Sequence, residues 1–177
     1  MEVKALTQLE GQEADGPWPN QMADLADSER LILSVFRHWL VGLVDKSGSR
    51  LSLAWNELAR ELGAARGRAA MSALIGLVRA LGHVRRPLRH HRPCCSCVSV
   101  DENALLSFLA TCQRQDWTLA RSQAEWLVAP DGVGDLLENG IKLSAALGSG
   151  GQSLPARYWS QPQDAGEAAE MQSSAVH

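Results

Sequence analysis

The stretch DSERLILSVFRHWLVGL (residues 27–43) decides the fold class of this 177-residue chain. Its apolar side chains recur at the three- to four-residue spacing of one helix face; they are Ile32, Phe36, Trp39, Leu40 and Leu43. The opposite face is polar, and we assign Arg37 to it together with Arg30, Ser34 and His38. The stretch therefore predicts an amphipathic helix, which Asp27 or Ser28 can cap.

Five further helices follow from the same spacing and from start and stop residues. We expect the second from Ser52 to Gly63, the third after a break at 64–67 and up to Gly82, and the others near 99–112, 116–128 and 133–147. Ser99 and Glu102 have the spacing of a capping box. Six helices with short connections predict an all-α compact bundle over residues 27–154, between a flexible acidic N-terminal arm (1–26) and a flexible C-terminal tail (155–177).

No apolar run approaches the length of a membrane span, and the N-terminus lacks the apolar stretch of a signal peptide. We therefore expect a cytoplasmic protein that does not bind membranes. In that compartment its four cysteines are expected to be thiols or metal ligands rather than disulfides. Cys112 falls on the apolar face of its predicted helix, so we expect it to be buried.

The net charge of −3 conceals a strong asymmetry along the chain. Between residues 62 and 100 there is no Asp or Glu, whereas seven arginines occur there. The segments on both sides are acidic. Such a block either contacts the acidic flanks of the same chain or offers a surface to phosphate or another polyanion.

The segment 83–98 stands out within this block, because it lacks a period and contains two prolines. It also concentrates the candidate metal ligands, and we expect zinc at His91, Cys94 and Cys97, the last two forming a C-x-x-C pair. Cys95 and His90 are the alternative ligands. Two other interpretations stay open, namely a thiol switch and a loop whose cysteines have no chemical role.

The stretch from Leu51 to Arg86 resembles the second and third helices of a winged helix-turn-helix module, with the basic loop in the place of the wing. The resemblance rests on the segments LARELG (residues 58–63) and LGHVRR (81–86). It implies a third helix in the major groove and a wing on phosphate. The nucleic-acid contacts it implies are Arg66, Arg68, Arg85, Arg86, Arg89 and Arg92.

Two classes of function are therefore carried forward. The first is a small bacterial-type regulator that contacts nucleic acid through residues 51–92 and uses the cysteine loop to bind a metal or sense redox state. The second is a non-catalytic adaptor whose basic loop docks an acidic partner protein. None of the common catalytic motifs is present, although a thiolate enzyme needs only Cys and His brought together in space. The oligomeric state does not follow from the sequence.

Overall fold

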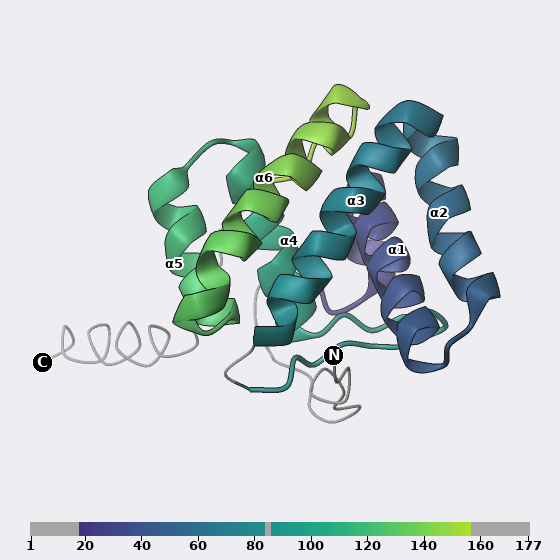
Figure 1. Ribbon diagram of the computed structural model, residues 1–177, viewed down its shortest axis with the longest axis horizontal. Coiled ribbons are helices and arrows are strands. Elements are labelled where there is room, and N and C mark those ends of the chain that lie inside the picture. Colours follow the sequence, from purple (N-terminus) through teal and green to yellow (C-terminus); the bar gives the residue numbers. More distant parts are fainter. Residues whose placement is uncertain (1–17, 84–85, 157–177) are drawn as a thin grey trace, which may run out of the picture.

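The computed structural model describes residues 18–83 and 86–156 and is built from helices (Figure 1). The α-helices are α1 (Asp27–Val44), α2 (Gly48–Leu62), α3 (Ala64–Ala80), α4 (Val100–Gln113), α5 (Trp117–Leu127) and α6 (Val133–Ser149). Three single-turn 3-10 helices accompany them: η2 (Met22–Asp24), η3 (Leu81–His83) and η4 (Pro130–Gly132). No strand occurs within the described ranges, so the all-α prediction is confirmed.

Two helix starts differ from the prediction. The second helix begins at Gly48 rather than at Ser52, whose hydroxyl instead donates a hydrogen bond to the Gly48 carbonyl at 2.9 Å. The third begins at Ala64, so the predicted break at 64–67 is wrong. Gly63 alone connects α2 to α3, because its φ of +79° lies in the region that glycine adopts without strain.

The helix α4 occupies the centre of the fold, behind α3 and α6 in the view of Figure 1. Every residue from Asp101 to Cys112 is buried, including Cys112 as predicted. The helix packs against α5 and α6, and also contacts α1. A helix that is buried on all sides must pair its polar side chains inside the protein.

Helices α4 and α6 approach closely at Gly140. A Cβ atom placed there would lie 2.5 Å from Cε1 of Phe108, whose side chain is fully buried. Helix α6 also packs along α3, and α1 packs against α2. The core therefore runs continuously through all six helices.

The described chain extends beyond the helices at both ends, before α1 into residues predicted to form the N-terminal arm and after α6 into the last residues of the predicted domain. Before α1, the Met22 amide donates to the Ser96 carbonyl at 2.6 Å, and Leu25 is buried. After α6, the Leu154 amide donates to the Gln113 side chain at 2.8 Å, and the Ser28 hydroxyl donates to the Ser153 carbonyl at 2.7 Å.

Candidate functional site

The site is built on a buried ion pair between α1 and α4. The Arg37 guanidinium donates through Nε to Oε1 of Glu102 at 2.7 Å and through Nη2 to Oε2 at 2.8 Å. Each side chain is only 1% exposed. The assignment of Arg37 to the polar face of its helix is therefore wrong. Arg37 lies one turn from both Leu33 and Leu40, which are themselves buried, and its charge is tolerated there because Glu102 neutralises it.

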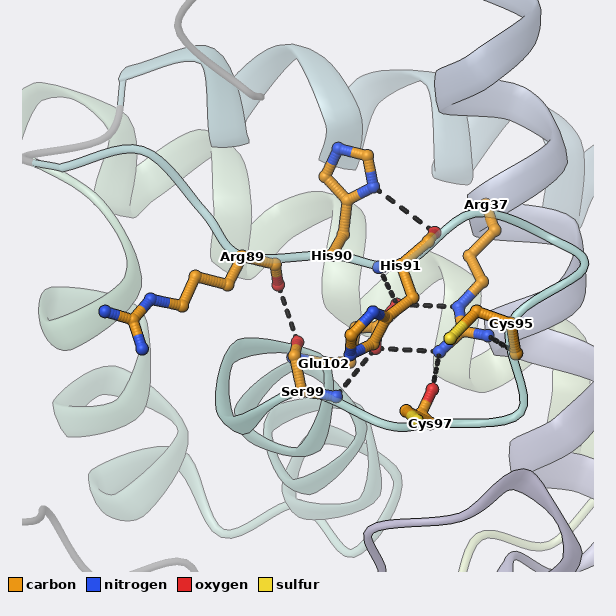
Figure 2. A network of polar contacts seen from close by, with 8 residues as sticks. All are labelled: Arg37, Arg89, His90, His91, Cys95, Cys97, Ser99 and Glu102. Carbon is orange, nitrogen blue, oxygen red and sulfur yellow. Dashed lines mark hydrogen bonds and ion pairs between the residues drawn. The ribbon is translucent and has the colours of Figure 1, made fainter. Parts of the chain in front are cut away.

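The same pair holds the basic loop, by which we mean residues 86–99. Arg37 donates to the Cys95 carbonyl at 2.8 Å and to the Cys97 carbonyl at 2.6 Å. Glu102 accepts from the His91 amide at 3.1 Å and from the Ser99 amide at 2.9 Å. Figure 2 shows the loop curving around this pair, with its backbone groups directed inward. Two side chains thus fix residues on both sides of the loop.

Asp101 provides a second attachment at the start of the basic loop. Its carboxylate accepts from both terminal nitrogens of Arg86, at 2.8 and 2.5 Å, and from the Arg89 amide at 2.7 Å. The hydrogen bonding of Arg86 to Asp101 raises the pKa of the Arg86 guanidinium. This guanidinium also lies 4.7 Å from the centre of the Trp126 ring on α5. Ser99 closes the arrangement by donating from its hydroxyl to the Arg89 carbonyl at 2.6 Å.

The segment before α1 borders the other side of the basic loop. Gln21 and Cys97 form an isolated antiparallel bridge. Beside it, the Val98 amide donates to the Asn20 carbonyl at 2.8 Å. The basic loop is therefore held between α4 and the N-terminal segment of the fold.

The carboxylates of α4 serve the helix and the loop at once. The predicted capping box is present, since the Glu102 amide donates to the Ser99 hydroxyl at 3.1 Å while Glu102 accepts from the Ser99 amide. Contact of the basic block with the acidic flanks of the same chain was one of the two interpretations of the sequence, but the hydrogen bonds by which Asp101 and Glu102 fix the loop backbone were not predicted. The only sequence signal for them is their position directly after a loop that contains no acid of its own.

The basic loop presents its remaining charges to solvent. The side chains of Arg89 and Arg92 are exposed, and so is Cys94. Figure 2 shows the Arg89 side chain pointing away from the network that its backbone joins. Among the described residues, no carboxylate forms an ion pair with Arg89 or Arg92. Two uncompensated guanidinium groups therefore project from a fixed backbone.

The predicted zinc ligands lie in the basic loop but are not gathered around one point. His90 is buried, with Nδ1 3.4 Å from the His91 carbonyl, and Figure 2 shows the two imidazole rings on opposite sides of the chain. Cys94 is exposed, whereas Cys95 and Cys97 are half-buried. Within the described ranges, no three His, Cys, Asp or Glu side chains are grouped so that they could hold a metal ion.

The predicted nucleic-acid contacts fall into two groups. Arg66 and Arg68 are exposed in the first turn and a half of α3, where Nε of Arg66 donates to the Leu62 carbonyl at 3.0 Å. Arg86, Arg89 and Arg92 follow the other end of that helix. A helix of 17 residues is about 25 Å long, so the groups are well separated. Arg85 lies outside the described residues.

The chain matches none of the protein-family models, curated proteins or solved structures with which it was compared. Within the described ranges, no helix combines the length and the apolar character that crossing a membrane requires.

Proposed function

We propose that the protein is a non-catalytic binding protein that docks an acidic segment of a partner protein on its basic loop. The observation that carries the proposal is the contrast between the backbone and the side chains of this loop. Arg37, Asp101 and Glu102 fix the backbone, while the guanidinium groups of Arg89 and Arg92 have no carboxylate among the described residues.

A fixed loop is suited to binding because association otherwise has to order it. Each mobile side chain that becomes immobilised at an interface opposes binding by about 0.5–1.5 kcal/mol, and ordering the backbone adds to this. Here the folded protein has already ordered the backbone. Arginine also offers a planar set of donors that matches a carboxylate in a two-pronged hydrogen bond.

The placement of the arginines favours an acidic protein over nucleic acid. The guanidinium group of Arg86 is already paired with Asp101, so it is less available to phosphate. Arg66 and Arg68 lie near the far end of α3. Arg89 and Arg92, the loop arginines without a described carboxylate, can pair with only a few carboxylates of a ligand. Nucleic-acid binders usually neutralise many phosphates.

The test is a titration with a fluorescently labelled peptide of about ten residues rich in glutamate, at low salt. We expect saturable binding to the full chain and a loss of about tenfold in affinity for the R89Q/R92Q variant, because both exposed partners of the carboxylates are gone. The matched control is R66Q/R68Q, which removes the same charge from α3 and should bind normally.

A labelled DNA duplex is titrated in parallel with the peptide. The proposal is overturned if the peptide does not bind, or if R89Q/R92Q and R66Q/R68Q lower the affinity for the peptide equally. Stronger binding of the duplex than of the peptide, with a steep loss of affinity as salt rises, would instead support the nucleic-acid regulator.

A further inference from the structure

A single guanidinium group holds the backbone of Cys95 and Cys97. Arg37 donates through Nη1 to the Cys95 carbonyl at 2.8 Å and through Nη2 to the Cys97 carbonyl at 2.6 Å, and Figure 2 shows both residues beside it. In an extended chain, residues two positions apart point their carbonyls to the same edge and their side chains to the same face. The thiols of Cys95 and Cys97 therefore lie on one face of the basic loop.

The burial of the loop residues follows the same alternation. Cys95 and Cys97 are half-buried, whereas the side chains of Cys94 and Ser96 are exposed. On the half-buried side, Nε2 of Gln21 donates to Sγ of Cys97 at 4.0 Å, so this thiol lies against the segment before α1. Cys94 faces solvent and does not share the face of the other two thiols.

The thiols of Cys95 and Cys97 are close enough to share one ion. A chain spans at most about 7 Å over two residues, and each sulfur atom is only two bonds from its Cα atom. Because both sulfur atoms lie on the same face, rotation of the two side chains is sufficient to bring an ion into contact with both. Arg37 keeps the backbone in place while they rotate.

The charges around the pair are compatible with thiolates, the form of cysteine that binds metal ions. The basic loop contains no acidic residue of its own. The two carboxylates that contact its backbone, those of Asp101 and Glu102, are neutralised by Arg86 and Arg37. A pair of thiolates at Cys95 and Cys97 therefore meets no uncompensated carboxylate from α4.

Two thiolates without a third ligand favour a soft ion of low coordination number. Structural zinc is almost always held by four ligands. Within the described ranges, no three His, Cys, Asp or Glu side chains are grouped to hold a metal. Cu(I) prefers thiolate sulfur and accepts two such ligands in a linear arrangement. We propose that Cys95 and Cys97 form a two-coordinate site for Cu(I).

Binding at this site is an exchange of protons for copper. Each thiol releases its proton to water, and two sulfur–copper bonds form, so that two thiolates and one monovalent ion leave a single net negative charge. Copper enters and remains as Cu(I), and no electron is transferred. The site does not depend on the acidic partner of the proposed function.

Competition for Cu(I) tests the site. The reduced full chain is titrated without oxygen against a chromophoric Cu(I) chelator, whose absorbance reports the copper that the protein removes. We expect about one Cu(I) per chain. The affinity should fall at least about a hundredfold in C95S and in C97S, because loss of a group that merely orients a ligand already costs about 10- to 100-fold.

The matched control is C94S, which removes the most exposed thiol of the same loop. Its affinity for Cu(I) should equal that of the parent chain. A parent chain that fails to compete with the chelator overturns the proposal. An equal loss of affinity in C94S and C95S also overturns it, because copper would then bind exposed thiols without regard to the face on which they lie.

The coordination of the copper gives a second measurement that needs no variant. X-ray absorption at the copper edge is recorded on the parent chain loaded with one equivalent of Cu(I). We expect two sulfur ligands and no nitrogen ligand. A third sulfur ligand, or a nitrogen ligand from an imidazole such as that of His91, overturns the assignment to Cys95 and Cys97 alone.

Discussion

Arg37 shows how one buried charge can organise a loop that is distant in sequence. It neutralises Glu102 and occupies two backbone carbonyls of the basic loop, so both its charge and its hydrogen-bonding groups are used. A buried ion pair by itself adds little to stability, but removal of one partner leaves the other charge uncompensated.

We therefore expect R37M to lower the free energy of unfolding by about 3–5 kcal/mol, because Glu102 and the carbonyls of Cys95 and Cys97 would lose their partner. Urea denaturation measures this. R121M is the control, since the Arg121–Glu125 pair is exposed and its loss should leave the midpoint unchanged. A midpoint for R37M equal to that of the control would contradict the role given to Arg37.

The four thiols should differ in reactivity according to burial. Burial raises the pKa of Cys112 from its ordinary value near 9.0 to about 12. We expect a maleimide at about pH 8 to modify the loop thiols, Cys94 fastest, and to reach Cys112 only after denaturation. Mass spectrometry counts the adducts. Because the folded-state pKa is the higher one, this thiol stabilises the fold fully below pH 9.0, and this stabilisation is lost as pH rises towards about 12.

Arg37 also marks the limit of what the sequence could predict about single residues. Its charge suggested the polar face, although Leu33 and Leu40 lie one turn away on the buried side. Glu102, the residue that makes its burial possible, is 65 positions further along the chain. No local pattern connects the two, so the pairing became apparent only in three dimensions.

At the scale of the elements, the helices followed from local patterns and the loop contacts did not. The apolar spacing of residues 27–43, the Ser99 cap and the stop at Gly63 act within a few residues, and each was predictable. The starts of α2 and α3 were misplaced by a few residues, because Ser52 and the small residues at 64–67 are compatible with either a helix or its flank. The position of α4 at the centre depends on packing among all the helices.

The contact between α4 and α6 yields a prediction about packing. G140A should destabilise the fold by about 1–3 kcal/mol, because the added methyl group would press against the Phe108 ring in a filled core. G134A lies in the first turn of the same helix, where nothing stands within 4 Å of the added atom. It should be neutral or stabilising by up to about 1 kcal/mol. In thermal melts, the melting temperature should fall for G140A and should stay the same or rise for G134A. Equal shifts in the two variants would contradict the close contact between Gly140 and Phe108.

At the scale of the whole molecule, protein side chains from two helices hold the backbone of the basic loop. The carbonyls of Cys95 and Cys97 and the amides of His91 and Ser99 all bind side chains of α1 or α4. We therefore expect a chelator to leave the melting temperature unchanged. A fall in melting temperature, together with about one zinc per chain by elemental analysis, would instead support the zinc site predicted at His91, Cys94 and Cys97.

The charge asymmetry of the sequence takes a definite form in the folded molecule. The acid-free residues 62–100 form α3, which packs against α2 and α6. They also form the basic loop, which Asp101 and Glu102 hold in place. The exposed guanidinium groups of Arg89 and Arg92 project from this fixed loop backbone and form no ion pair with a described carboxylate. We propose that the protein binds its partner at these two arginines rather than at the start of α3.

Amide chemical-shift mapping locates the binding site residue by residue. The ¹⁵N-labelled chain is titrated with the glutamate-rich peptide at low salt, and the moving resonances are assigned. We predict that the shifts concentrate in residues 89–97 and disappear in R89Q/R92Q. Shifts confined to the turn between α2 and α3, around Arg66 and Arg68, or the absence of any shift, would show that the basic loop is not the binding site.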